Sequence, residues 1–347
     1  MKTATPATAR AINDRLALDL LLAHGPLTAP QLRDLTGLSR PTVADLVERL
    51  RAAGLVEAGG ETGEERRGPN ARLYALVADR ALVAGVDIRR SGIAVTVADL
   101  TGSTVGSAAR PLPRPPAGGE VDLPALVAEA VAEAAAGRTL QVVAVGAPGL
   151  MHPRTRAMIA GNDVPGWRAD LLPELGSRLG AGQVLLENEV NLAAIAEHRT
   201  GAATGSEDFV LLWLENEGVG GAVVLGGRLR RGVSGGAGEL GLLDIGGESF
   251  CETVDLRAVL DLPREQLADR IARGLFAVVA VLDPGLIVLG GSTGRAGGEA
   301  LAALVAERVA LRSLAPTEIR PSTVEGNAVL QGAVLTALDL ARDEVFG

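Results

Sequence analysis

The stretch FVLLWLENEGVGGAVVLGGRLRRGVSGGAGELGLL, residues 209–243, decides how this chain folds. It contains two short apolar runs, 209–214 and 222–225, that are bounded by turn residues, as buried strands usually are. Between the runs lie three closely spaced glycines, Gly218, Gly220 and Gly221. Glycine lets a backbone turn sharply and approach a ligand closely. The stretch therefore predicts two strands joined either by a plain tight turn or by a ligand-binding turn.

Length and composition predict a globular protein. The 347 residues, of which 47% are hydrophobic, are enough for two or three packed domains. No run approaches the roughly 20 apolar residues of a membrane span, and the N-terminus lacks a signal-peptide core, so we expect no membrane contact and a cytoplasmic location. A single cysteine, Cys251, excludes an internal disulfide framework and any multi-cysteine metal site.

The net charge of −9 falls on the part of the chain after residue 80, because residues 1–80 are nearly neutral. An acidic balance argues against a large nonspecific nucleic-acid surface. It is compatible with a small DNA-reading head on an acidic body.

The N-terminal part has the order of a helix-turn-helix. An apolar helical pattern covers residues 11–25, and TAPQLRDLTGLSRPTVADLVERLRAAGL follows at 28–55. Thr28 and Ser39 have the side chains of helix caps, and Gly37 has the freedom that the turn requires. In this motif the last helix enters the major groove of DNA by its N-terminal residues.

The outward side chains of that last helix are the predicted DNA contacts. They are the polar residues that the inward apolar stripe leaves free: Ser39, Arg40, Thr42, Asp45 and Arg49. Hydroxyl and guanidinium groups suit phosphates and base edges, whereas Asp45 either orients an arginine or accepts a hydrogen bond from cytosine.

A wing is predicted after the last helix, where a polar loop separates short strands at 55–57 and 72–76. Its basic and amide side chains suit contact with the DNA backbone or minor groove: Arg66, Arg67, Asn70 and Arg72. Alternatively, the winged helix-turn-helix serves protein contacts only and these charges are simply solvated.

Beyond residue 80 the predicted elements come in two similar series. The first consists of strands at 82–88, 92–102 and 104–111, a helix at 123–136 and a strand at 142–146. The second consists of strands from 209 to 225, a helix at 265–282, a strand at 286–289 and helices at 297–309 and 327–343. Two α/β lobes around a cleft are expected. The predicted domains are a winged helix-turn-helix at 1–80 and a two-lobed body at 81–347.

Five segments of the body carry a resemblance to a known family. They are VGAPG (145–149), DVPGW (163–167), LLENEVNLAAIAE (185–197), GVGGAVVLGGRLRRGVSGGAGELG (218–241) and DPGLIVLGG (283–291). In this order they resemble the signatures of the ROK family of bacterial sugar kinases and transcription regulators. The resemblance implies an actin-like ATPase (ribonuclease H-like) fold, and the added head is similar to the regulator branch, such as the xylose and N-acetylglucosamine repressors.

The chain departs from the kinase pattern where nucleotide would bind. Arg89 and Arg90 stand where the kinases of the family have glycines, and Glu215-Asn216-Glu217 covers the second phosphate segment. A like-charge pair at about 4 Å costs roughly 4 kcal/mol at an effective dielectric near 20. Glu189 replaces the aspartate of the kinase general base, and a displacement of about an angstrom can cost roughly 100-fold in rate. We therefore expect no enzymatic activity.

The resemblance implies a partly kept sugar pocket, formed by Asp163, Asn188, Glu189, Glu239 and Glu252. Alternatively, Glu239 and Glu252 form structural bridges with arginines at 228, 230 or 231. The family's zinc histidine falls on Leu242, and one cysteine cannot complete a tetrahedral site. The sequence therefore predicts no metal and no cofactor.

Together these patterns predict a transcription regulator, a repressor, that binds double-stranded DNA and responds to a sugar or sugar derivative. Since helix-turn-helix proteins usually read paired half-sites, we expect a homodimer or a dimer of dimers. Two alternatives stay open: an active ATP-dependent sugar kinase with an accessory DNA-binding domain, and a regulator whose sugar pocket is vestigial.

Overall fold

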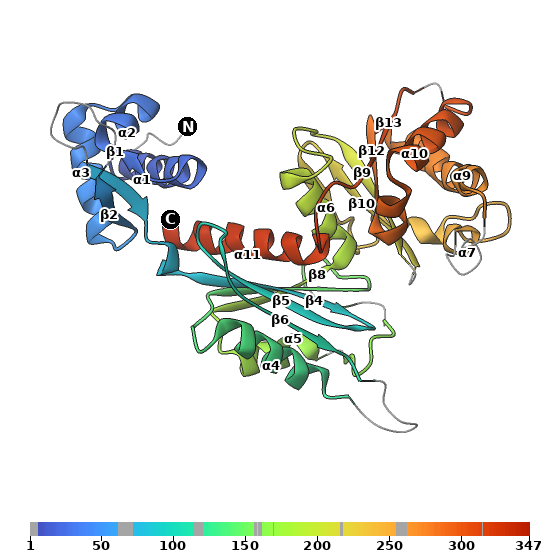
Figure 1. Ribbon diagram of the computed structural model, residues 1–347, viewed down its shortest axis with the longest axis horizontal. Helices are drawn as coiled ribbons and strands as arrows, with labels where there is room; N and C mark the ends of the chain where they lie inside the picture. Colours follow the sequence, from blue (N-terminus) through green and yellow to red (C-terminus); the bar gives the residue numbers. More distant parts are fainter. Residues whose placement is uncertain are drawn as a thin grey trace.

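A computed structural model of the chain describes residues 6–61, 72–113, 121–155, 158, 162–168, 170–215, 218–254, 262–313 and 315–347. These residues form a small head and a body of two lobes, each with its own sheet (Figure 1). In the described ranges no helix combines the length and apolar character that crossing a membrane requires.

The head is a winged helix-turn-helix, as predicted. It consists of α1 (Pro6–His24), β1 (Leu27–Thr28), α2 (Ala29–Thr36), α3 (Arg40–Ala52), β2 (Val56–Glu61) and β3 (Arg72–Leu76), with the strands in the order β1-β3-β2. Thr28 caps α2 through a reciprocal pair of bonds, since its Oγ1 accepts from Gln31 N at 3.3 Å and its own N donates to Gln31 Oε1 at 2.8 Å. Gly37 then ends α2 in the left-handed region, with φ of 69°.

Lobe I is built on five strands in the order β6-β5-β4-β7-β8. They are β4 (Leu82–Arg89), β5 (Gly92–Asp99), β6 (Thr104–Pro111), β7 (Val142–Ala147) and β8 (Gln183–Asn188). The first three pair antiparallel, and β4, β7 and β8 pair parallel. One face packs on α4 (Leu123–Ala135) and α5 (Leu171–Leu179), and the other on α6 (Glu189–Thr200) and α11 (Ala328–Phe346) (Figure 1).

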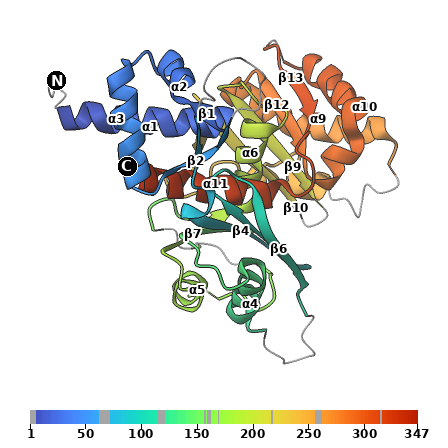
Figure 2. The same ribbon diagram turned by 60° about the vertical axis from the view of Figure 1, so that its left-hand side comes forward.

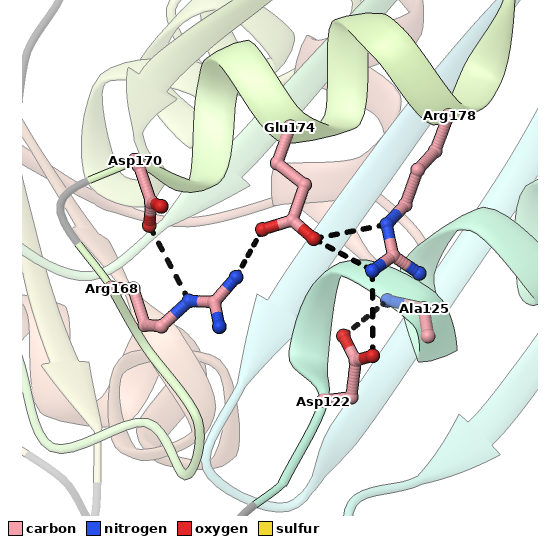
Figure 3. Close-up of polar contacts among 6 residues, drawn as sticks. All are labelled: Asp122, Ala125, Arg168, Asp170, Glu174 and Arg178. Carbon is pink, nitrogen blue, oxygen red and sulfur yellow. Dashed lines mark hydrogen bonds and ion pairs between the residues drawn. The ribbon is translucent and has the colours of Figure 1, made fainter.

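A cluster of charged side chains joins the two helices on the outer face of lobe I (Figure 3). Asp122 caps α4, because its Oδ1 accepts from Ala125 N at 3.0 Å, and its Oδ2 lies 3.4 Å from Arg178 Nη2. Glu174 of α5 binds that same guanidinium at 2.6 Å and also pairs with Arg168. Trp167, next to Arg168 in the chain, packs against the core of lobe I.

Lobe II repeats this architecture, in the strand order β11-β10-β9-β12-β13. Its strands are β9 (Phe209–Glu215), β10 (Gly218–Leu225), β11 (Arg228–Arg230), β12 (Leu286–Gly290) and β13 (Glu318–Pro321). Again three strands pair antiparallel and three parallel. The helices that the structure describes in this lobe are α7 (Phe250–Thr253), α9 (Arg264–Leu282) and α10 (Gly291–Ala310). The two-lobed α/β body predicted from the repeated element order is confirmed.

Some elements differ from the sequence prediction. Helix α10 begins at Gly291 instead of near residue 297, because two helical segments continue across a kink at Gly298, where φ is 55°. No element was predicted for residues 171–200, where the structure has α5, β8 and α6. Since α6 starts at Glu189, directly after the last residue of β8, no turn residue separates the two elements in the sequence.

Candidate functional site

A cavity of about 320 Å³ lies between the lobes and is the candidate ligand site. It is lined by residues from the ends of β4 and β8, the start of α6, strands β9 and β10 and the loop at 235–239. The cavity brings together four of the five residues predicted to bind a sugar, Asp163, Asn188, Glu189 and Glu239.

Asn188 and Glu189 are positioned by the junction of β8 and α6. Asn188 is the N-cap of α6, and its Oδ1 accepts from Val190 N at 2.8 Å and from Asn191 N at 3.1 Å. Its Nδ2 donates to Glu189 Oε2 at 2.9 Å and to Gly149 O at 3.1 Å. The Asn188 amide is therefore held with both ends engaged, and it fixes the direction of the Glu189 carboxyl group.

Glu189 has an unusual protonation state for a carboxyl group. Burial is the main cause that raises its pKa from the ordinary 4.5 to about 8, and the nearby Asp87 and Glu239 add to the rise while Arg89 opposes it. At neutral pH this carboxyl group is mostly protonated. It can therefore donate a hydrogen bond to a ligand as well as accept one.

Two of the other predicted sugar ligands also line the cavity, in different settings. Asp163 forms an ion pair with Arg90 at the rim of the cavity. Burial raises the pKa of the Glu239 carboxyl group. The alternative that Glu239 pairs with Arg228, Arg230 or Arg231 is not observed among these described residues, and Arg231 Nε donates instead to the buried Glu187, at 2.7 Å from its Oε2.

Glu252, the fifth predicted sugar ligand, is not brought to the cavity. Its carboxylate belongs to the capping box of α7, where it accepts from Ser249 N at 2.8 Å and from Ser249 Oγ at 2.7 Å. These hydrogen bonds lower the pKa of Glu252. A local helix-capping partner therefore occupies this side chain, and its sugar contact stays a prediction that this geometry does not favour.

The position expected for nucleotide phosphates is filled by protein groups. Arg89 Nε donates to Asp87 Oδ2 at 2.9 Å, and Arg89 Nη1 lies 3.7 Å from Glu215 Oε1. Glu215 accepts from the N and Oγ of Ser292, at 3.0 and 2.8 Å, in the first turn of α10. A helix N-terminus of this kind attracts anions, and here it holds a carboxylate of the chain itself. Asn216 and Glu217 lie outside the described residues.

The glycines of β10 allow the close approach that the sequence suggested. A Cβ atom on Gly220 would lie 2.9 Å from a methyl carbon of Val190, and one on Gly221 would lie 2.5 Å from Leu240. Both glycines line the cavity. Gly220 brings β10 against the start of α6 and Gly221 brings it against Leu240, so both glycines contribute to one wall of the cavity from within the strand.

On the head, the predicted DNA contacts fall into two groups. Ser39, the N-cap of α3, lies 2.8 Å from Thr42 through their hydroxyl oxygens, and Arg40, Thr42 and Asp45 are exposed. Arg49 is engaged within the head, because Nη2 donates to Asp14 Oδ1 of α1 at 2.6 Å and Nη1 pairs with Asp45. Of the two roles that the sequence left open for Asp45, the structure has it orienting an arginine.

The wing strands β2 and β3 pair antiparallel, with Arg72 opposite Glu61 at their outer end. Arg72 is exposed at that end. The other predicted wing contacts, Arg66, Arg67 and Asn70, lie outside the described residues.

Three residues of the cleft network were missed in the sequence: Asp87, Ser292 and Asn327. Asp87 gave the clearest signal, since a carboxylate in the apolar strand LVAGVDI requires a partner when buried. In the parts of the chain that the structure describes, no group of three or more His, Cys, Asp or Glu side chains is arranged to hold a metal ion.

Comparison with family profiles divides the chain into two parts. Residues 83–252 match the ROK family, and residues 12–68 match the MarR family. Both matches agree with the head and body seen in the fold.

Curated relatives are similar to the body. The glucokinase of Streptomyces coelicolor is 32% identical over 161 residues, which are 46% of this chain and 49% of that protein. The polyphosphate glucokinase of Mycobacterium tuberculosis is 28% identical over 215 residues, 61% of this chain and 77% of that protein. The chain thus spans about half the length of the first of these relatives.

The solved structures similar to this chain differ in how much of it they cover. The ROK hexokinase from Thermus thermophilus covers 76% of this chain and 99% of its own, with a TM-score of 0.63 and 28% identity. A ROK family transcriptional regulator, described as a homolog of the E. coli MLC protein, covers 97% of this chain and 98% of its own, with a TM-score of 0.72 and 17% identity. The hexokinase likeness therefore leaves about a quarter of the chain uncovered, whereas the likeness in fold to the regulator extends over head and body.

Proposed function

We propose, from the premise that this chain belongs to the ROK family and carries a MarR-type winged helix, that it is a sequence-specific DNA-binding transcriptional regulator and acts as a repressor. The observation that carries the proposal is the combination of an exposed recognition-helix start at Ser39, Arg40 and Thr42 with a body whose phosphate position is filled by Glu215. Such a regulator works in the cytoplasm, where the DNA is. Its proposed domains are a head at 1–80 and a body at 81–347.

The body is proposed to sense a sugar or sugar derivative in the interlobe cavity. Glu189 and Glu239 supply hydrogen-bond acceptors and, through the protonated Glu189, a donor, while Asn188 lines the same cavity and holds the Glu189 carboxyl group in place. Neutral hydroxyl groups are recognised by such mixed donor and acceptor sets. Trp213 and the glycines of β10 add apolar and backbone surface to the same cavity.

Enzymatic activity is proposed to be absent. A nucleotide phosphate placed at the start of α10 would meet the Glu215 carboxylate, which already accepts two hydrogen bonds there. Displacing it exposes a triphosphate to like charge and removes the partner of Ser292. The competing function, a sugar kinase with an accessory head, is favoured by the similarity of the body to glucokinases.

A DNA-binding experiment tests the main proposal. The purified chain is titrated into labelled DNA from upstream of its own gene, at low and at physiological salt, with shuffled DNA as competitor. We expect a discrete complex that survives the competitor and an affinity that falls as salt rises. Equal binding to both DNAs at every salt concentration would contradict a sequence-specific regulator.

A phosphoryl-transfer assay tests the competing function with the same preparation. We expect no ADP release above the solvent background when ATP, magnesium and a panel of hexoses are added.

Sedimentation of the free and DNA-bound protein tests the proposed homodimer or dimer of dimers, which the reading of paired half-sites requires.

A further inference from the structure

Helix α11 connects the cleft with the head. Its nineteen residues, Ala328–Phe346, correspond to about 28 Å at 1.5 Å per residue. It lies along lobe I, with its start between the lobes and its end beside α1 of the head, as two views of the ribbon agree (Figure 1, Figure 2). One straight element therefore has an end at each of the two sites that a regulator has to couple.

The cleft end of α11 is held by Asn327. Its Oδ1 accepts from Leu330 N at 3.0 Å and so caps the helix, while its Nδ2 donates to Asp87 Oδ2 at 2.7 Å. Asp87 is 2% exposed, and within the described residues its Oδ1 has no hydrogen-bond partner. The charge of Asp87 is therefore compensated mainly by Asn327 and by Arg89.

Arg89 links this buried carboxylate to the open cleft. It lines the cavity between the lobes and faces Glu215 of lobe II at 3.7 Å. A ligand that binds Arg89 or moves Glu215 changes the electrostatic environment of Asp87. Because an uncompensated buried carboxylate is costly, Asp87 would then depend more strongly on the amide of Asn327.

The middle of α11 is too tightly packed to absorb a displacement. A Cβ atom on Gly332 would lie 1.8 Å from Leu192 O of α6, and one on Gly85 of β4 would lie 2.8 Å from Val334 N. Close-packed contacts of this kind transmit a shift instead of absorbing it. A change at Asn327 therefore moves the helix together with its neighbours.

The other end of α11 touches the head directly. Arg15 of α1 pairs with Asp343 at 3.0 Å, and its guanidinium carbon lies 5.5 Å from the centre of the Phe346 ring. Phe346 is 7% exposed and belongs to the same buried cluster as Leu18 of α1. The last turns of α11 thus contact the first helix of the head through an ion pair, a cation–π contact and buried apolar packing.

We propose that α11 transmits the state of the interlobe cleft to the DNA-binding head, through Arg89, Asp87 and Asn327 at one end and Asp343, Phe346 and Arg15 at the other. The output on DNA rests on the proposed function, whereas the mechanical link is a property of the free protein. Ligand binding in the cleft is coupled to DNA binding by the head only if the ligand binds more tightly to one of two arrangements of α11 and the head than to the other.

Hydrogen–deuterium exchange on the free protein tests the link. In Asn327→Asp the new carboxylate still caps α11, but it cannot donate to Asp87 and repels it. We expect exchange to become about fivefold faster or more not only at 327–334 but also at residues 12–24 of the head. Asn327→Ser removes the amide without adding charge, keeps a capping hydroxyl, and should change the same two segments.

A matched control is Arg33→Ala, which removes an exposed arginine of the head that pairs only with its neighbour Asp34 in the described contacts. We expect this variant to leave exchange in α11 at the wild-type rate. If both Asn327 variants alter 327–334 and leave 12–24 at the wild-type rate, the proposed transmission is overturned.

A double-mutant cycle then tests the output on DNA. If both ends belong to one path, Asn327→Asp changes DNA affinity about fivefold or more in the wild type and not in the Arg15→Ala background. Additive effects of the two substitutions would overturn the path. Absence of any DNA binding would count against the proposed function and would leave the exchange result on the free protein standing.

Discussion

Arg89 of β4 and Glu215 of β9 face each other across the cleft, with Nη1 and Oε1 3.7 Å apart, so the two lobes meet through an arginine and a glutamate. The same arginine donates to the buried Asp87. A cleft that would have to admit a polyanion for kinase chemistry is instead closed at this point by charges of the chain itself.

The pairing of Arg89 with Asp87 predicts a loss of stability in Arg89→Ala. Breaking a buried ion pair by removing one partner costs about 3–5 kcal/mol, and since Arg89 is 28% exposed we expect about 2 kcal/mol. Urea unfolding measures the difference. Adding Asp87→Asn to the same chain removes the unpaired charge and should recover part of the loss, whereas an unchanged midpoint in Arg89→Ala would show that the pair is not stabilising.

The raised pKa of Glu189 predicts that stability falls as pH rises. Its pKa is about 8 in the folded chain against an ordinary 4.5, so the folded state binds the proton more tightly. The contribution is complete below pH 4.5 and is lost as pH rises through 8. By linkage the loss between pH 6 and pH 8 is about 2 kcal/mol. Urea unfolding of the wild type and of Glu189→Gln at both pH values measures this loss. If the free energy of unfolding changed equally with pH in the two proteins, the raised pKa of Glu189 would be refuted.

The exposed start of α3 predicts that Arg40→Ala weakens DNA binding. Losing one guanidinium contact should reduce the affinity for DNA about tenfold or more. If the contact is to a phosphate, the slope of the logarithm of the binding constant against the logarithm of the salt concentration falls in magnitude by about one. Fluorescence anisotropy over a range of salt concentrations measures both quantities. Arg51→Ala is the control, because Arg51 lies at the far end of the same helix and pairs with Glu48, at 2.9 Å.

The contacts of Arg49 predict a structural role that can be separated from DNA contact. Arg49 binds Asp14 of α1 through two nitrogens, Nη2 at 2.6 Å and Nε at 3.3 Å. We expect Asp14→Asn to destabilise the head by under about 1 kcal/mol and Arg49→Ala by a similar amount. Thermal unfolding of the two single variants and of the double variant measures the coupling, and additive losses would show that the pair does not interact.

The close packing of α11 against α6 predicts that alanine substitutions at two helical glycines have opposite effects on stability. In Gly332→Ala the new methyl group meets Leu192 O, and we expect a loss of at least about 1–3 kcal/mol. In Gly176→Ala of α5 nothing lies within 4 Å of the new carbon, so the helix should gain about 0.5–1 kcal/mol. Melting temperatures of the two variants test this difference. A Gly332→Ala protein as stable as the wild type would show that α11 and α6 are not closely packed at Gly332.

The sequence alone predicted the winged head and the paired lobes correctly, because each rests on short-range patterns. Thr28 and Ser39 cap their helices within three residues, and the buried strand at 209–214 is visible as an apolar run. The resemblance brought Asp163, Asn188, Glu189 and Glu239 to one pocket, and the structure places all four along one cavity. Their binding of a sugar stays a prediction.

Tertiary structure alone decided which charges meet. Asp87 and Asn327 are 240 positions apart, and Arg15 and Asp343 are 328 apart, so no period or local motif announces either contact. Glu252 is the exception, because its partner is local: Ser249 and Glu252 have the Ser-x-x-Glu spacing of a capping box, a signal that the sequence already contained. Secondary structure follows from neighbours along the chain, whereas the partner of a buried or engaged charge depends on which distant segments the packed core brings together.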